Sequence, residues 1–274
     1  MPRQEYSSLL HGLEAAYCPS LSRDGSLIRD RSGRNKHGTH TNVTPTVLGG
    51  RMALGYTTSP LSSTNLGARI NVSAASGITY CAWSFGRSDT PSIISRGAVD
   101  YFYAYNNGAQ LQIAYGNAAG TVNSANMGTL QLANAWNHYA AAITRTATGT
   151  STAFFCNGVA FSTVTNGVSL DTVQGPNANS WLLGLLQISG TNYGSNTSFD
   201  DVRIYRRALT AHEVCLLYSR PGIGLTPLPD RGGGLPRRWS VNVGGTWRSA
   251  DSYLNVGGVW KLGQPSVNVA GNWR

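Results

Sequence analysis

Apolar residues alternate with small or polar residues along several short runs of this 274-residue chain. Runs of this kind cover residues 79–85, 101–105, 110–115, 136–144, 152–157 and 199–205. Gly, Asn, Ser and Asp residues separate them, as turns separate the strands of an antiparallel sheet. The pattern predicts an all-β fold, an antiparallel β-sandwich, over most of the chain.

One segment, residues 209–218, has the spacing of an amphipathic helix. Thr210 stands three residues before Glu213, which is the arrangement of a capping box at a helix N-terminus. Leu209, Val214 and Leu217 fall on one side of the expected helix. We therefore expect a helix that closes the β-rich part at about residue 219.

The last 36 residues contain a tandem repeat with a period of 13 residues. Its units are SVNVGGTWR, YLNVGGVWK and SVNVAGNWR. Two small residues between short apolar runs supply the backbone freedom that a two-residue turn requires, so each unit predicts a β-hairpin. Isolated hairpins leave much apolar surface uncovered, and we expect the tryptophans to dock on the body, on another copy of the chain or on a different protein.

These patterns divide the chain into three segments. Residues 1–219 form a β-rich body, residues 220–238 a linker rich in Pro, Gly and Arg, and residues 239–274 the hairpin repeats. The charged fraction is only 12%, with 33 Gly, which argues against a helical bundle, a coiled coil or a charged disordered chain. Four cysteines stand singly among apolar neighbours, and we expect buried thiols rather than disulfides or a zinc site.

The chain is basic, and its charge is concentrated toward the C-terminus. It has 21 basic and 12 acidic residues, a net charge of +9, of which residues 220–274 contribute +5. All but two of the basic residues are Arg, which suits bidentate contact with carboxylate or phosphate, so a polyanionic neighbour is expected: nucleic acid, an acidic glycan or an acidic protein surface. The predicted anchoring residues are Trp247, Trp260, Trp273, Arg237, Arg238, Arg248, Lys261 and Arg274.

The order of several motifs resembles the LamG-like jelly roll of the concanavalin A-like lectin/glucanase superfamily. The motifs are HGLEAAYCPS, SLIRDRSGRNKHGTHTN, ITYCAWSF, WNHYAAAITR, FFCNGVAFST and FDDVRIYRRALTAHEVCLLY, and they span about residues 11–218. The resemblance implies a jelly-roll β-sandwich, in which Trp83 and Trp136 are expected as core residues. The fold supports glucanases, lectins, adhesion modules and structural domains, so the site residues must decide the function.

The scarcity of carboxylates argues against an enzyme. A glycosidase needs two carboxyl groups beside the sugar, and glucanases of this superfamily carry theirs as E-x-D-x-E on one strand. Glu occurs only at positions 5, 14 and 213, so that strand does not exist here. No motif for a catalytic nucleophile or a phosphate-binding loop is present either, and no catalytic residue is assigned.

Asp200 and Asp201 form the only adjacent carboxylate pair. The resemblance implies that an acidic residue at this position can hold a structural Ca²⁺ with oxygen ligands from the opening loop, which makes Asp200 and Asp30 a candidate calcium site. In the alternative, one aspartate pairs with Arg203, Arg206 or Arg29, and the other is solvated. No other cofactor is expected.

Tyr101, Tyr103 and Tyr105 alternate along one run, so they share one face of a strand. If exposed, they form an aromatic platform for sugar rings, with Asn106 and Asn107 offering amide groups to the hydroxyls. If buried, they are sandwich core.

The hairpin repeats resemble those that end many virion proteins of tailed bacteriophages. The hypothesis is a non-enzymatic virion structural protein, made in the host cytoplasm without a signal peptide, which displays the jelly roll for capsid decoration or for tail attachment to a host. Its expected partners are other virion proteins, copies of itself and a cell-surface glycan, with no membrane insertion and no specific nucleic acid. The alternative is a free-standing carbohydrate-binding lectin or adhesion module.

Overall fold

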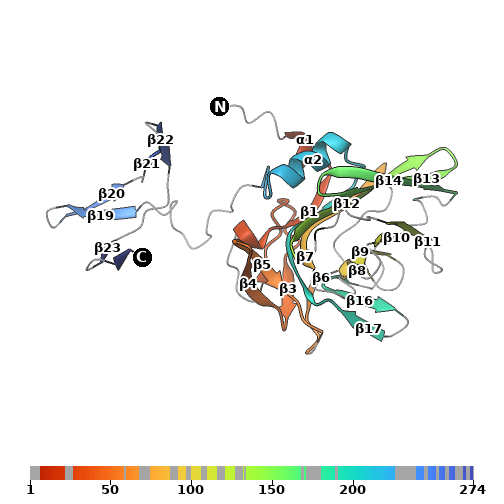
Figure 1. Ribbon diagram of the computed structural model, residues 1–274, viewed down its shortest axis with the longest axis horizontal. Helices are drawn as coiled ribbons and strands as arrows, with labels where there is room; N and C mark the ends of the chain where they lie inside the picture. The colour runs from red at the N-terminus through yellow and green to blue at the C-terminus, as the bar shows by residue number, and fades with distance from the viewer. Residues whose placement is uncertain are drawn as a thin grey trace. The chain divides into compact units, whose positions relative to one another are not determined.

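The chain forms two compact units, residues 1–227 and residues 228–274 (Figure 1). The computed structural model describes residues 7–21, 27–58, 60–67, 75–86, 92–96, 100–105, 110–115, 121–126, 132, 134–167, 170, 180–188, 191–225, 239–243, 246–250, 253–256, 259–262, 268–269 and 272–273. No helix among them is long and apolar enough to cross a membrane.

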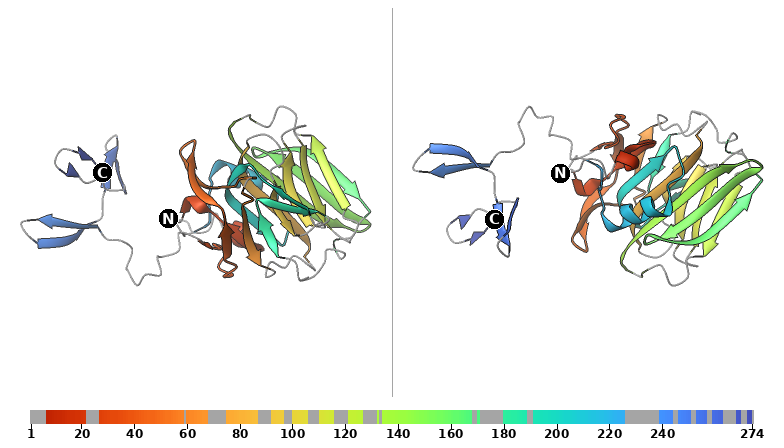
Figure 2. Two further views of the ribbon diagram at one scale, coloured as in Figure 1. Left: turned by 90° about the horizontal axis from the view of Figure 1, so that it is seen from below. Right: turned by 90° about the horizontal axis from the view of Figure 1, so that it is seen from above.

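The body is a sandwich of two large antiparallel sheets (Figures 1 and 2). The first sheet has the strand order β14 (Val159–Asn166), β13 (Gly149–Cys156), β12 (Trp136–Thr146), β7 (Gly77–Gly86), β18 (Thr197–Tyr205), β5 (Arg51–Gly55) and β4 (Thr44–Leu48), with β1 (Leu13–Tyr17) also paired to β18. This arrangement confirms the predicted antiparallel jelly roll, and each alternating run of the sequence lies on a strand.

The second sheet faces the first. It has the order β11 (Thr121–Asn126), β10 (Gln110–Tyr115), β9 (Asp100–Tyr105), β8 (Ser92–Arg96), β15 (Trp181–Leu183), β6 (Ser63–Gly67), β3 (Gly38–Thr41) and β2 (Leu27–Ile28). A separate hairpin joins β16 (Leu185–Ile188) to β17 (Thr191–Gly194).

Side chains from the facing sides of the two sheets form the main core. Phe102, Phe154, Trp181 and Phe199 are at most 1% exposed, which follows from the alternation of inward and outward residues along each strand. Trp83 is buried, as predicted, but it lies on the outer side of the first sheet, where its ring stacks on that of Tyr218 at 5.5 Å.

The outer side of the first sheet has a second apolar cluster beneath the helix α2 (Ala211–Ser219). Thr210 caps α2 and Glu213 completes the predicted capping box, while Val214 and Leu217 are buried. The short helices α1 (Ser7–Leu10) and η1 (Pro19–Leu21) precede and follow β1.

The start of the predicted linker packs on the body. Ile223 and Leu225 are buried in the same cluster as α2, and the compact unit runs to Pro227 rather than to residue 219. No disulfide joins the four cysteines, all of which are described; Cys18, Cys81 and Cys156 are buried as expected, whereas Cys215 on α2 is exposed.

The C-terminal segment folds as three separate hairpins, as its repeat predicts. They are β19 (Trp239–Val243) with β20 (Thr246–Ala250), β21 (Tyr253–Val256) with β22 (Val259–Leu262), and β23 (Asn268–Val269) with β24 (Asn272–Trp273). All three have the same register, because Asn242, Asn255 and Asn268 stand opposite Trp247, Trp260 and Trp273.

Candidate functional site

The candidate site begins with the hairpin of β4 and β5 at one edge of the first sheet. Gly49 and Gly50 form its two-residue turn with φ of +54° and +76°, values that glycine adopts without steric cost. In the register of this hairpin, Thr44, Thr46 and Leu48 face the same side of the sheet as Gly55 and Arg51. The pairing therefore sets two hydroxyls and an aliphatic side chain in a row on the outer side of the sheet.

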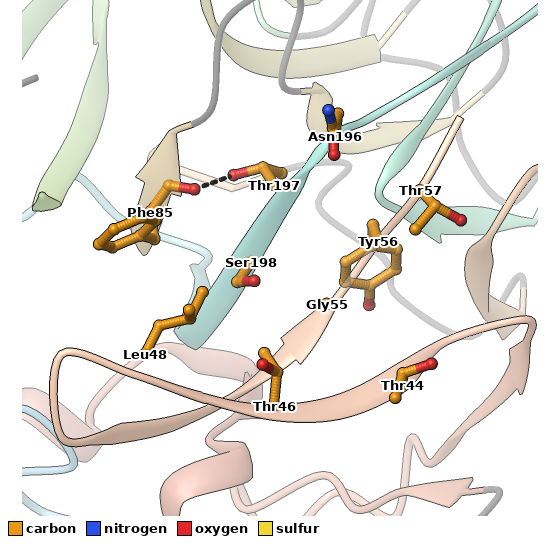
Figure 3. A pocket seen from close by; sticks show the side chains of 10 residues that line it. All are labelled: Thr44, Thr46, Leu48, Gly55, Tyr56, Thr57, Phe85, Asn196, Thr197 and Ser198. Atoms are coloured by element: carbon orange, nitrogen blue, oxygen red, sulfur yellow. Dashed lines mark hydrogen bonds between the residues drawn. The ribbon is translucent and has the colours of Figure 1, made fainter. Parts of the chain in front are cut away.

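A pocket of about 180 Å³ lies over this row (Figure 3). Its lining consists of Thr44, Thr46, Leu48, Gly55, Tyr56, Thr57, Phe85, Asn196, Thr197 and Ser198. Leu48 and Phe85 lie on one side of it, whereas Thr44, Thr57 and Asn196 lie on the other. Of the described residues that line the pocket, none is charged. The pocket thus has an apolar wall opposite neutral polar groups.

Four polar side chains of this lining have no hydrogen-bond partner in the described part of the chain. Thr44, Thr46, Asn196 and Ser198 make no side-chain hydrogen bond to any described residue. Thr197 differs, because its hydroxyl donates to the backbone oxygen of Phe85 at 2.8 Å, which joins β18 to β7 beneath the pocket (Figure 3). Four unused hydroxyl and amide groups around one hollow are available to a ligand that offers several hydrogen-bonding groups of its own.

Trp136 extends the apolar wall toward the centre of the sheet. Its Nε1 donates to the Leu48 backbone oxygen at 2.8 Å, and its ring meets that of Phe85 edge-on at 5.6 Å and 69°. Trp136 is partly exposed on the outer side of the sheet rather than buried in the core, which corrects its prediction. The indole is held by both the hairpin and β7, so its position is well defined.

Arg51 lies beside this tryptophan. Its guanidinium carbon is 3.9 Å from the ring centre of Trp83 and 5.1 Å from that of Trp136. Its Nε is 3.9 Å from Oδ2 of Asp200, so the two charges attract each other without a hydrogen bond. Burial lowers the pKa of Arg51, and the charge of Asp200 opposes that shift.

Asp200 and His138 are buried near the same rings. Oδ1 of Asp200 accepts a hydrogen bond from the Ser20 backbone at 3.2 Å, while Oδ2 has no hydrogen-bond partner among the described residues. Burial raises the pKa of Asp200, and the charge of Asp201 raises it further. Burial also lowers the pKa of His138 to about 3, so this imidazole is neutral at physiological pH.

Asp201 forms an ion pair with Arg203, which is the pairing predicted as the alternative to calcium binding. Its carboxylate accepts two hydrogen bonds from Arg203, at 2.7 and 3.0 Å, and both side chains are buried. Asp201 has a φ of +46° at a bulge in β18, and this conformation places the carboxylate beside the guanidinium two residues later. The other aspartate, Asp200, is fully buried rather than solvated.

The residues proposed for calcium do not fit an ion shared by Asp30 and Asp200. Oδ1 of Asp30 accepts hydrogen bonds from the backbones of Ala16 and Ser32, and Oδ2 accepts from the Ser32 hydroxyl and the Lys36 backbone. Asp30 therefore has no oxygen left for a metal, and it orders the opening loop instead. The described residues contain no group of three or more His, Cys, Asp or Glu that could hold a metal ion, and calcium at Asp200 alone stays a prediction.

Tyr101 and Tyr103 of β9 lie on the outer side of the second sheet. Tyr101 and Tyr103 are partly exposed, with ring centres 5.4 Å apart, while Phe102 between them is fully buried in the core. The Tyr103 hydroxyl donates to Gln112 on β10, whose amide donates to Gln110 at 2.9 Å. The rings are on the surface side, as the glycan platform requires, and glycan binding there stays a prediction.

Several other predicted site residues are beyond what the structure describes. Asn106, Asn107, Arg237, Arg238 and Arg274 lie outside the described residues. Tyr105, Trp247, Arg248, Trp260, Lys261 and Trp273 lie on described strands, but their side chains do not belong to the described part. Their predicted roles are unchanged.

The pocket itself was not predicted from the sequence. Its signal was the segment TPTVLGGRMALG, in which a Gly-Gly pair stands between two alternating runs. That pattern predicts the hairpin, but local spacing does not show that β7 and β18 lie next to it, and so it does not show the pocket.

The strand order and the two facing sheets define a class of protein, the jelly-roll β-sandwich. Residues 57–215 match the family model described as the concanavalin A-like lectin/glucanases superfamily. The match covers more than half of the chain, and the chain belongs to this superfamily. No curated protein matches it significantly.

Solved structures share the fold at low sequence identity. The binding domain of Paraclostridial Mosquitocidal Protein 1 is 17% identical with a TM-score of 0.55, over 77% of this chain and 52% of that one. A botulinum neurotoxin type C structure, titled for its interaction with two ganglioside molecules, is 12% identical with a TM-score of 0.58, over 78% and 53%. The chain thus spans about half the length of these two.

Domain 4 of AbnA, an extracellular arabinanase of Geobacillus stearothermophilus solved with arabinotriose, is matched over nearly its whole length. It is 18% identical with a TM-score of 0.54, over 75% of this chain and 98% of that domain. The first of these structures is described as a binding domain and the third as one domain of an arabinanase, and at such identities all three establish the fold alone.

Proposed function

We propose that the β-sandwich is a non-catalytic module that binds a glycan in the pocket between β4, β5, β7 and β18. The observation that carries this proposal is the set of four unused hydroxyl and amide groups that line the pocket together with Leu48 and Phe85. A sugar ring has the complementary surface, with hydroxyls at its edge and C–H groups on its faces. Carbohydrate sites combine such polar groups with aromatic contacts.

The lining also supports binding rather than hydrolysis. Glycoside hydrolysis needs two carboxyl groups beside the scissile bond, and no described residue of the lining is charged. The arabinotriose in the AbnA domain and the gangliosides named for the neurotoxin are ligands of the same chemical class in proteins of similar fold.

Removing two of the unused hydroxyls is expected to weaken glycan binding about 30-fold. The double variant Thr46→Val, Ser198→Ala keeps the shape of the pocket and deletes two hydrogen-bonding groups, each worth about 1 kcal/mol. A glycan array identifies the bound sugar, and calorimetry with that sugar measures both affinities.

Thr163→Val is the matched control, because Thr163 is exposed on β14, at the opposite edge of the same sheet. A third variant, Tyr103→Ala, reports on the tyrosine face of the second sheet. Loss of signal in Tyr103→Ala with full binding by the pocket variant would move the glycan site to that face. Equal glycan binding by wild type and Tyr103→Ala would exclude the tyrosine platform as the glycan site.

We also propose that the three hairpins attach this module to a larger assembly, a bacteriophage virion assembled in the host cytoplasm, so that the sandwich serves in decoration or host attachment. The support is the tandem repeat with its common Asn–Trp register and the net charge of +5 in residues 220–274. A free-standing lectin or adhesion module is the second candidate. The glycan pocket is compatible with both candidates and does not distinguish them.

Deleting residues 239–274 is expected to abolish attachment while the body keeps its fold, because the hairpins form a separate compact unit. Co-sedimentation of full-length and truncated chains with purified particles measures attachment, and circular dichroism checks the fold. The triple variant Trp247→Ala, Trp260→Ala, Trp273→Ala tests the tryptophans directly. Full occupancy by the truncated chain would exclude the anchoring role and leave the lectin hypothesis.

A further inference from the structure

Arg51 is the cross-strand neighbour of a residue that lines the pocket. In the hairpin register it lies directly opposite Leu48, whose side chain belongs to the pocket wall, and both point to the outer side of the sheet. Side chains that face each other across an antiparallel pair start about 5 Å apart. A ligand that fills the pocket and extends past Leu48 therefore meets the guanidinium.

The hydrogen-bonding groups of Arg51 are unused. A guanidinium has five N–H donors, yet Arg51 makes no hydrogen bond to any described residue. Its Nη1 is buried and has no hydrogen-bond partner among the residues that the structure describes, and 19% of the side chain remains exposed. The nearest carboxylate oxygen, Oδ2 of Asp200, is 3.9 Å from Nε, which is beyond hydrogen-bond distance.

The surrounding rings hold the guanidinium in place. Trp83 at 3.9 Å and Trp136 at 5.1 Å interact with its positive charge through their faces, so the side chain is positioned before any ligand arrives. Burial disfavours the charge, which is why the pKa of Arg51 is lowered, and the charges of Asp200 and Asp201 offset part of this cost without a hydrogen bond to the guanidinium among the described residues. An anion bound at the guanidinium would supply the missing hydrogen bonds.

We infer that the glycan bound by this module is acidic, and that Arg51 binds a sugar carboxylate next to a neutral sugar unit held in the pocket. This inference rests on the proposed function and names its ligand class. The planar guanidinium matches a carboxylate in two parallel hydrogen bonds. The neutral sugar is assigned to the pocket because the pocket lining is uncharged. The carboxylate is assigned to Arg51 because this positive charge lies beyond Leu48.

The test is an array on which each acidic oligosaccharide, containing sialic, glucuronic or galacturonic acid, stands beside its neutral counterpart of the same length. The full-length chain, Arg51→Gln and Arg34→Gln are compared. Arg34 is the matched control, because its side chain is 48% exposed in the opening loop and its replacement removes the same charge. Wild type and Arg34→Gln are expected to prefer the acidic member of at least one pair by about tenfold or more, and Arg51→Gln to bind both members alike.

The salt dependence of wild-type binding gives a second readout that does not depend on a variant's folding. Binding of the acidic member should weaken between 50 and 500 mM NaCl, while binding of the neutral member should change little, because charge pairs are screened by salt. Arg51→Lys keeps the charge without the planar group and should lose most of the preference.

The outcomes separate the two proposals. Equal binding of acidic and neutral members by wild type, or an unchanged preference in folded Arg51→Gln, overturns the role of Arg51 and leaves the glycan pocket standing. No binding to any pair overturns the proposed function, and the acidic-ligand inference with it.

Discussion

Replacing Arg203 by methionine is expected to lower the free energy of unfolding of the body by about 3–5 kcal/mol. The guanidinium is fully buried, donates twice to Asp201 and donates to the Ile223 backbone oxygen at 2.8 Å. Its removal leaves the Asp201 carboxylate buried without its positive partner, which is the costly event when a buried ion pair is broken. Denaturation by urea, followed by tryptophan fluorescence, measures the change.

The double variant Asp201→Asn, Arg203→Met separates the lost contacts from the unpaired charge. Because the double variant has no buried charge at this position, it should be more stable than Arg203→Met alone. Equal stability of the single variant and wild type would mean that the buried pair contributes nothing to the fold. Arg203 lies on the outer side of the first sheet, where residues 221–225 cover it.

Gly184→Ala is expected to destabilise the body by about 2–5 kcal/mol and to weaken glycan binding. Gly184 has a φ of +73°, and a Cβ atom there would lie 2.1 Å from Cδ1 of Tyr56. The ring cannot move easily, because its hydroxyl is 2.7 Å from Oγ1 of Thr64 and its centre is 5.2 Å from that of the tilted Phe199 ring. Since Tyr56 lines the pocket, the displaced ring should disturb the site as well.

Gly67→Ala is the control for the energetic cost of placing alanine in a left-handed backbone conformation. Gly67 has a φ of +69°, but a Cβ atom there would have nothing within 4 Å. Its replacement should cost only the left-handed conformation, about 1–2 kcal/mol. The difference between the two variants in thermal unfolding measures the clash with Tyr56, and equal destabilisation would show that Tyr56 adapts without loss.

Local patterns predicted those parts of the fold that local interactions determine. The helix capped by Thr210 and the strand that carries Tyr101 and Tyr103 follow from spacing alone, and the hairpins of the repeat follow from two small residues between apolar runs. The jelly-roll topology came from the resemblance, because the order of strands in a sheet depends on contacts between residues far apart in the chain.

The candidate pocket depends on such distant contacts. Thr46, Phe85 and Ser198 belong to three strands that are neighbours only in the folded sheet. The environment of Arg51 is equally non-local, since its two tryptophans come from β7 and β12. Composition predicted an anionic partner from the excess of arginine, but it could not single out Arg51 among 19 arginines.

The hairpins of the repeat also have a consequence for how the tail can vary. Each hairpin pairs its strands only within its own 13-residue unit, and in the described strands no unit pairs with the next. Units of this kind can be gained or lost without shifting the register of the remaining ones. The tail can therefore change its length in steps of 13 residues, each of which adds or removes one tryptophan. Under the proposed anchoring role, the strength of attachment then depends on the number of units.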